Sequence, residues 1–194
     1  MNSVAFEPRY NIAPQSNVLT IFRGDENYEL AEMQWGMVPD WAKPGQFKQP
    51  LINARSETIW QKPSFRQLIK SRRCIIPISG FFEWQRNGST KVPHAIRVKD
   101  EPFMLLGGIY QITKHGELQH CIVTTESNKA MQQVHHRQPV MLDLAQAKTW
   151  LENEDKPAID KLMTACPDSW LDIYPVSNYV SNARNQGPEC IARI

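Results

Sequence analysis

The sequence predicts an α+β protein built on a mixed or antiparallel β-sheet, with short helices at its edges. Most segments in the middle of the chain are short, rich in β-branched and aromatic residues, and bounded by turn residues. Helical periodicity is confined to a few short segments. No repeat, low-complexity tract or linker interrupts the 194 residues, so we expect one compact domain over residues 1–194.

Strand patterns begin with a hairpin near the N-terminus. Residues 18–23 and 28–35 are extended runs on either side of turn residues 24–27. Asn87 and Gly88 mark a second, tight hairpin. Further strands are expected at residues 74–78, 81–85, 93–98, 103–110 and 119–125, and the tail is expected to be extended at 171–176 and 189–194.

Helices are expected where apolar residues recur on one face and capping signals precede them, at residues 64–73, 127–135, 143–151 and 157–165. Ser64, Ser127 and Asp143 can each act as an N-cap by accepting a hydrogen bond from the first turn. Pro157 stands in a first turn, where its missing N–H has no helical partner to lose.

Composition excludes a membrane-embedded chain and a uniformly basic domain. No apolar run approaches the roughly 18 residues that a membrane span needs. The net charge is +2 and the pI is about 8.3, whereas a uniformly basic nucleic-acid-binding domain has a pI above about 9. Any nucleic-acid surface must therefore be local. No secretory signal pattern opens the sequence, and we expect a cytoplasmic protein, nucleoid-associated in a bacterium.

The cysteines predict neither a metal site nor a disulfide framework. Cys74, Cys121, Cys166 and Cys190 are far apart in the sequence and form no C-x-x-C pair. We expect them to be reduced core thiols, and we expect neither a metal nor a cofactor.

Polar side chains in the first third of the chain could bind a phosphate or a base. Asn53 and Arg55 follow two apolar residues, and strand alternation would place both on one face, an amide beside a guanidinium. Residues 9–14 combine a cation, a phenol and an amide, although a capped loop is the simpler interpretation. Trp41 lies among glycine and proline and is either a stacking platform for an unpaired base or a core aromatic.

Glu83 is a carboxylate between bulky aromatic residues on an expected strand. If it is buried, desolvation raises its pKa and suits it to proton transfer near neutral pH. If strand alternation turns it outward, it is an ordinary surface acid between the inward-facing Phe82 and Trp84. The local sequence leaves both interpretations open.

His135 and His136 stand at an expected helix-to-strand junction. Adjacent histidines lie about 100° apart on a helix and do not chelate one metal as an i, i+4 pair would. One catalytic histidine is the functional interpretation. A surface pair near a helix C-terminus is the simpler one.

Seven short motifs follow one another along the chain: RYNIAP (residues 9–14), WGMVPDW (35–41), LINARSET (51–58), FFEW (81–84), IVTTESN (122–128), VHHRQPVML (134–142) and PVSNYVSNARNQGPE (175–189). Together and in this order they resemble the SRAP family, the SOS-response-associated peptidase domains that sense abasic sites in single-stranded DNA. The resemblance implies a compact, barrel-like β-rich core with peripheral helices.

The chemistry that the resemblance implies is covalent capture of DNA. An N-terminal cysteine, freed by autocatalytic removal of the initiator methionine, would attack the ring-opened aldehyde of an abasic sugar. An α-amine has a pKa near 8, so a useful fraction is neutral and nucleophilic at pH 7. The imine that forms would then be closed by the thiol into a five-membered thiazolidine.

Motif positions assign roles by resemblance. Asn53 would orient the nucleophile or the aldehyde, Glu83 would shuttle protons for imine formation and methionine removal, and His135 would assist opening of the sugar ring. The residues expected to bind DNA are Arg55 and Arg137, which would grip flanking phosphates, and Asn11, Pro14 and Trp41, which would shape the groove.

The start of the chain departs from the family pattern. The family begins Met-Cys-Gly-Arg, whereas this chain begins Met1-Asn2-Ser3. A thiazolidine needs a terminal aminothiol, so we expect a truncated N-terminal segment and impaired activity in this form. The alternative is a non-catalytic module that binds single-stranded or junction DNA. The expected partners are single-stranded DNA with abasic sites and proteins of the replication fork, with the chain acting as a monomer.

Overall fold

The computed structural model describes residues 7–43 and 45–194. The expectation about a Met-Cys-Gly-Arg start concerns residues 1–6, which lie outside the described residues.

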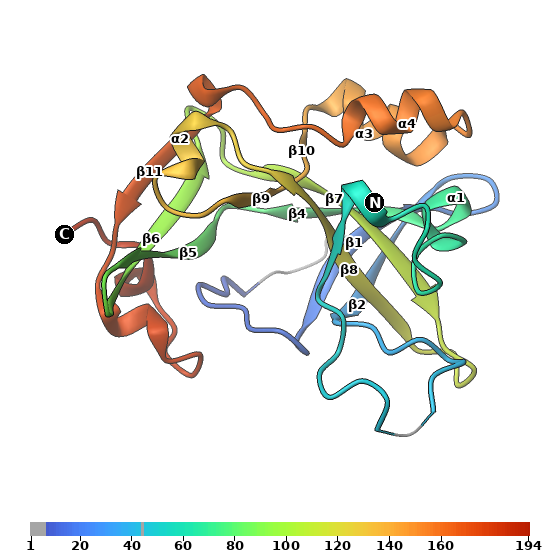
Figure 1. Cartoon of the computed structure of the whole chain (residues 1–194), viewed down its shortest axis with the longest axis horizontal. Helices are drawn as coiled ribbons and strands as arrows, with labels where there is room; N and C mark the ends of the chain where they lie inside the picture. The colour runs from blue at the N-terminus through green and yellow to red at the C-terminus, as the bar shows by residue number, and fades with distance from the viewer. Residues whose placement is uncertain (1–6, 44) are drawn as a thin grey trace.

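Two β-sheets form the core of the structure (Figure 1). The larger sheet contains β1 (Asn17–Arg23), β2 (Tyr28–Trp35), β3 (Asn53–Arg55), β4 (Arg73–Ile78), β7 (Met104–Ile112), β8 (Leu118–Glu126), β9 (Arg137–Pro139) and β10 (Met141–Leu142). The smaller sheet contains β5 (Phe81–Asn87), β6 (Thr90–Val98) and β11 (Leu171–Pro175), in the order β11-β6-β5.

The larger sheet curves back on itself. Its pairings run from β7 through β4, β1 and β2 to β8, and β8 also pairs with β7. Strands β2 and β8 meet over only two residue pairs, so the sheet is barrel-like rather than a continuous closed barrel. Strand β8 is parallel to β2 and β3 and antiparallel to β7 and β9. The predicted α+β class with a mixed, β-rich core is confirmed.

The helices are short and peripheral, as predicted. They are α1 (Leu68–Ser71), α2 (Lys129–Gln132), α3 (Leu144–Glu152) and α4 (Lys156–Leu162), with 3-10 turns η1 (Ser56–Thr58), η2 (Asp168–Trp170), η3 (Asn178–Ser181) and η4 (Pro188–Ile191). In Figure 1, α3 and α4 lie together at one end of the molecule, away from the smaller sheet. Within the described residues, no helix is long and apolar enough to cross a membrane.

Three expected segments differ from the structure. The regular helix expected at 64–73 is only α1, because the residues before it mix i−3 and i−4 hydrogen bonds, and Arg73 already belongs to β4. The helix expected at 127–135 is only α2, and its N-cap is Asn128 rather than Ser127. The extended tail expected at 189–194 begins as η4, which follows Gly187 at φ 105°.

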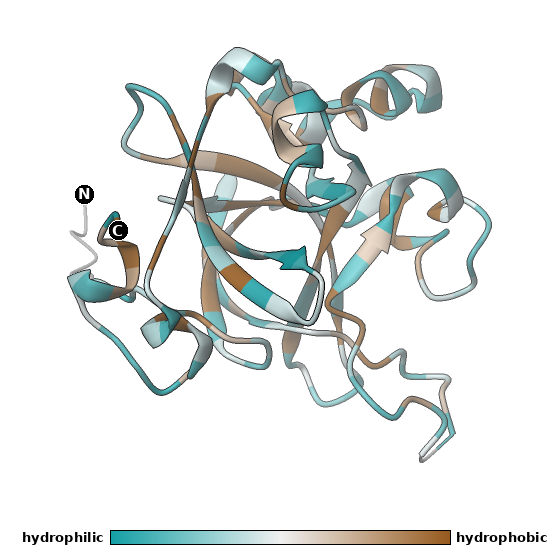
Figure 2. Ribbon diagram, turned by 60° about the vertical axis from the view of Figure 1, so that its left-hand side comes forward, coloured by the Kyte–Doolittle hydropathy of each residue, from teal (hydrophilic) through white to brown (hydrophobic). Residues whose placement is uncertain are grey.

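Helix α3 is held against the larger sheet by a side chain that it contributes to the hydrophobic core. Asp143 caps α3 as predicted, and the helix buries Trp150 completely against β4 and β7. The Trp150 indole N–H donates to the carbonyls of Cys74 (3.1 Å) and Gly108 (3.3 Å). Figure 2 shows apolar segments on the central strands and polar residues along the outer loops. All four cysteines are free and buried, which confirms the prediction of reduced core thiols.

Candidate functional site

A cavity of about 1240 Å³ lies between the two sheets. Its wall is formed by residues 7–14, by strands of the larger sheet, by β5 and β6, and by the segment after α2. Seven of the eight predicted site residues line it: Asn11, Pro14, Asn53, Arg55, Glu83, His135 and Arg137. The fold thus gathers side chains from separate motifs around one space.

Asn53 and Arg55 reach the cavity because β3 is a regular strand. Ala54 between them is completely buried, whereas Asn53 and Arg55 are exposed on the opposite face. The predicted alternation is therefore present. The parallel pairing of β3 with β8 places Asn53 beside Ile122 and holds the amide and the guanidinium at a fixed spacing along the wall.

Glu83 faces the cavity from the middle of β5, and His135 faces it from the end of the α2 segment. The distance between His135 Nδ1 and Glu83 Oε1 is 3.7 Å, and the two side chains are 34% and 30% exposed. Burial raises the pKa of Glu83, while the attraction of His135 and a backbone hydrogen bond from Trp84 act in the opposite direction. Glu83 is thus neither a fully buried acid nor an ordinary surface acid. It is a half-buried acid beside an imidazole.

The backbone of Arg137 offers the His135 ring both a hydrogen-bond donor and an acceptor. Its Nδ1 accepts from the backbone N–H of Arg137 at 3.2 Å and lies 3.1 Å from the carbonyl oxygen of the same residue. A neutral Nδ1 can accept from the N–H, and a protonated Nδ1 can donate to the carbonyl or face Glu83. The ring of His136 lies 4.5 Å from that of His135. Glu83 and His135 together can hold and transfer a proton.

Arg137 is held by an acid that the sequence analysis did not single out. Its guanidinium binds both carboxylate oxygens of Glu57, at 2.9 and 3.0 Å, and donates to the carbonyl of Thr124 at 2.7 Å. This ion pair lowers the pKa of Glu57. The Nε of Arg137 is buried without a hydrogen-bond partner among the described residues. Glu57 stands two residues after Arg55, inside the LINARSET motif, and this position is the sequence signal for it.

Asn11 and Pro14 shape the wall rather than offer free polar groups. Asn11 is buried, and its side-chain amide donates to the carbonyls of Val180 (3.0 Å) and Asn182 (3.1 Å). Pro14 opens a turn in which the N–H of Ser16 bonds to the carbonyl of Ala13. Gln15 follows Pro14 with φ 72°, as position i+2 of a type II turn requires.

Comparison with known proteins decides the family. The sequence pattern that defines the SOS response associated peptidase (SRAP) family matches residues 1–183. This chain belongs to the SRAP family.

Several SRAP relatives carry the name abasic site processing protein. YoqW of Bacillus subtilis (strain 168) is 38% identical over 193 residues, which cover 96% of this chain and 86% of YoqW. YedK of Escherichia coli (strain K12) is 34% identical over 94% of this chain and 83% of YedK. HMCES of Xenopus tropicalis is 31% identical over 100% of this chain and 68% of HMCES.

The fold also resembles that of proteins of known structure. A crystal structure of a protein from Bacteroides thetaiotaomicron superposes with a TM-score of 0.79 at 30% identity, covering 96% of this chain and 82% of that protein. A phage-related protein from Bordetella bronchiseptica superposes with a TM-score of 0.74 at 27% identity, covering 90% of this chain and 84% of that protein.

Trp41 is the one predicted SRAP site residue that does not line the cavity. It is 54% exposed on the loop between β2 and β3, and its ring meets that of Phe47 edge-on at 6.0 Å. This exposed position is compatible with base stacking outside the cavity, and the role of Trp41 stays a prediction.

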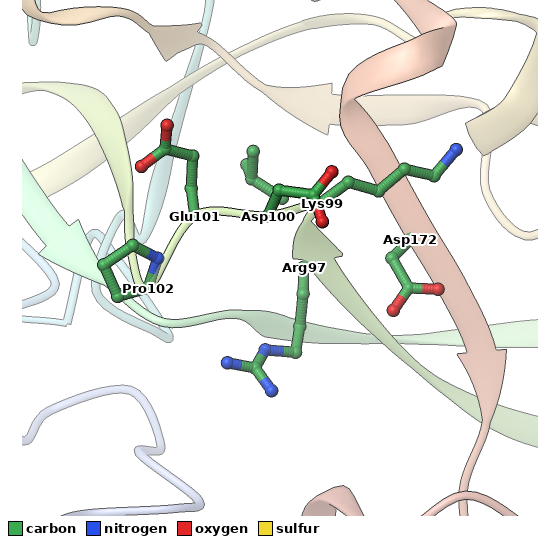
Figure 3. A pocket seen from close by; sticks show the side chains of 7 residues that line it. Arg97, Lys99, Asp100, Glu101, Pro102 and Asp172 are labelled. Carbon is green, nitrogen blue, oxygen red and sulfur yellow. The ribbon is translucent and has the colours of Figure 1, made fainter.

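A second, open hollow of about 420 Å³ lies where β6 ends beside β11 (Figure 3). Arg97 and Asp172 are register partners on these strands, and Lys99, Asp100 and Glu101 continue the rim. Its rim carries charges of both signs, and it contains no residue of the seven SRAP motifs. Within the described residues, no cluster of three or more His, Cys, Asp or Glu could hold a metal ion. The large cavity is therefore the candidate site.

Proposed function

We propose that this chain processes abasic sites in single-stranded DNA and that the large cavity receives the abasic sugar. The observation that carries the proposal is the Glu83–His135 pair at 3.7 Å, in the same cavity as Asn53 and Arg55. The relatives named abasic site processing proteins support the same activity. Arg55 is exposed on the wall and is available for a phosphate beside the lesion.

Imine formation defines the proton transfers that the site must perform. An amine adds to the aldehyde carbon of the opened sugar; the carbonyl oxygen takes a proton and nitrogen gives one up, which yields a neutral carbinolamine. Loss of that hydroxyl as water, with loss of a proton from nitrogen, gives the imine. Glu83 can donate the first proton and accept the second, because its raised pKa brings its acid and carboxylate forms closer in energy near neutral pH. His135 would assist ring opening, and Asn53 would orient the aldehyde by a hydrogen bond.

The covalent product depends on the nucleophile. An α-amine alone gives an imine, whereas a terminal aminothiol adds its sulfur to the imine carbon, passes the thiol proton to nitrogen and closes a thiazolidine. The first cysteine of the printed sequence is Cys74, which is buried, and burial raises the pKa of its thiol. We therefore assign the imine to a chain whose terminal residue lacks a thiol and the thiazolidine to a form that begins Met-Cys-Gly-Arg. Replication-fork partners and the monomeric state stay predictions.

The test is adduct formation with an abasic single-stranded oligonucleotide. Borohydride should trap a covalent complex with the chain as printed, and a form given a Met-Cys-Gly-Arg start should form a heat-stable adduct without borohydride. The same oligonucleotide with an intact base is the control and should give no adduct. Binding without any adduct in either form would favour a non-catalytic DNA-binding module. A folded protein that neither binds nor reacts would contradict both functions.

A further inference from the structure

The C-terminal loop, residues 177–187, is clasped to the N-terminal segment, residues 9–14. The side-chain oxygen of Gln186 accepts from the backbone N–H groups of Tyr10 (3.1 Å) and Asn11 (3.2 Å). The side-chain nitrogen of Gln186 donates to the carbonyl oxygen of Asn11 at 2.8 Å. One amide therefore serves as both acceptor and donor, as a neighbouring strand would.

A side chain of the N-terminal segment also binds the C-terminal loop, and we call these reciprocal hydrogen bonds the clasp. The side chain of Asn11 donates to two carbonyls of the C-terminal loop, those of Val180 and Asn182. Asn11 and Gln186 are 175 residues apart in the sequence, so their contacts join segments near opposite ends of the chain. Five hydrogen bonds in total join the two segments through these side chains.

The clasped segments form one wall of the cavity. Residues 7–14 line it, and so do Val180, Ser181 and Ala183 of the loop. The indole N–H of Trp84 donates to Ser181 Oγ at 3.1 Å, which joins the loop to β5 next to Glu83. The loop therefore contacts both the N-terminal segment and the strand that carries the proposed proton-transfer acid.

We propose that Gln186 is a positioning residue for the proposed reaction, because it sets where the N-terminal segment runs along the cavity wall relative to β5. The inference rests on the proposed function, in which the chain's own α-amine is the nucleophile. Gln186 does not itself line the cavity, so it acts through the backbone of Tyr10 and Asn11. Loss of the clasp should reduce the fraction of time in which the amine can reach the sugar.

Two variants separate the acceptor and donor parts of the clasp. Gln186→Ala removes its three side-chain hydrogen bonds, whereas Gln186→Glu keeps an acceptor for the two N–H groups and places a carboxylate beside the Asn11 carbonyl. Asn185→Ala is the matched control, because Asn185 donates only within the loop, to the carbonyl of Tyr179 at 2.7 Å.

The experiment measures three quantities for each variant: amide hydrogen exchange at Tyr10 and Asn11, the Kd for abasic single-stranded DNA, and the trapping rate at saturating DNA. For Gln186→Ala we expect exchange faster by about tenfold, a trapping rate lower by about tenfold, and a Kd within about twofold of the wild-type value. Gln186→Glu should fall between Gln186→Ala and wild type. Asn185→Ala should keep the wild-type trapping rate.

Particular outcomes would overturn the inference. A wild-type trapping rate in Gln186→Ala, with faster exchange at Tyr10 and Asn11, would mean that the clasp is structural only. The same conclusion would follow if Asn185→Ala lowered the rate as much as Gln186→Ala did, or if Kd rose in parallel with the loss of rate. Absence of trapping both in the wild-type chain and in the form given a Met-Cys-Gly-Arg start would instead contradict the proposed function.

Discussion

Glu83 is the residue whose surroundings most favour chemistry. It is half-buried on β5, which penalises its charged form, and it lies 3.7 Å from an imidazole, which favours that form. The first effect is the larger, so the pKa of Glu83 is raised from its ordinary value of 4.5. An ordinary surface glutamate would be almost entirely ionised at neutral pH and would be a poor proton donor.

Glu83→Gln should lower the rate of imine trapping by about 100-fold, because the amide can neither donate nor accept a proton in the reaction. In the wild-type protein, the step that needs the carboxylate should become faster as pH rises through the pKa of Glu83. Since that pKa is raised, the acidic limb of the pH–rate profile should lie above pH 4.5. This limb should disappear in Glu83→Gln, whereas the separate limb of the α-amine, whose pKa is near 8, should remain. A variant that keeps both the rate and the acidic limb would remove Glu83 from the mechanism.

We propose that Glu57 limits the positive charge that Arg137 can present to DNA, because the two side chains form an ion pair. Because the guanidinium is already paired, Glu57→Gln should free about one additional charge for phosphate binding. The slope of log K against log salt for single-stranded DNA should then become steeper by about 0.7. The measurement is a Kd series over salt concentration. Glu101→Gln, an exposed acid in the second hollow, is the control and should leave the slope unchanged. Equal slopes in all three proteins would mean that Arg137 makes no phosphate contact.

At the scale of the elements, short strands and helix caps fix the positions of the side chains that line the cavity. Strand β3 is only three residues long, yet its pairing with β8 directs Asn53 and Arg55 into the cavity. Helix α2 has four residues, and its N-cap Asn128 also donates to the carbonyl of Cys166, which anchors the segment that carries His135. Helix α3, by contrast, contributes Trp150 to the hydrophobic core and no residue to the cavity wall.

Asp143→Ala should destabilise the protein without changing its chemistry. Asp143 and Gln146 form a reciprocal capping box at the start of α3, with hydrogen bonds of 2.8 and 3.0 Å. Loss of such a cap costs about 1 kcal/mol, which corresponds to about 2–4 °C in Tm for a chain of this size. Thermal unfolding measures the loss. The trapping rate at 25 °C should stay at the wild-type value, because neither residue lines the cavity. A reduced rate would indicate coupling between α3 and the site.

At the scale of the whole molecule, folding buries an imidazole in the wall between the two sheets. His120, Ile122 and Thr124 alternate along β8 and line the cavity side of the strand. His120 is 1% exposed, and its Nδ1 has no hydrogen-bond partner among the described residues. Burial lowers its pKa from 6.5 to about 4.

The stability of the fold should therefore depend on pH through His120. Between pH 4 and 6.5 the unfolded chain binds a proton at His120 that the folded chain does not, so stability rises with pH in this window and is lost as pH falls. The contribution is about 3 kcal/mol over the whole window. Denaturant unfolding at several pH values measures it. In His120→Phe the free energy of unfolding should change less between pH 4 and 6.5 than in the wild-type protein. An unchanged pH dependence would show that His120 does not cause it.

Much of the local structure could be predicted because its causes are local. The first hairpin follows from extended runs around turn residues, and the start of α3 follows from Asp143 as a cap. The predictions were wrong where tertiary contacts replace local preference. The expected helix from residue 64 is largely turns, where Phe65 is buried in the core, and the expected C-terminal strand begins as a 3-10 turn that buries Cys190.

The sequence by itself determined the fold class, the order and type of most elements, and the motifs that place this chain in the SRAP family. Only the tertiary structure decided which side chains meet. Glu83 meets His135, Glu57 neutralises Arg137, and Gln186 holds the segment that runs along the cavity wall. The physical reason is that hydrophobic period and capping act within a few residues, whereas these contacts depend on how distant strands pair and curve.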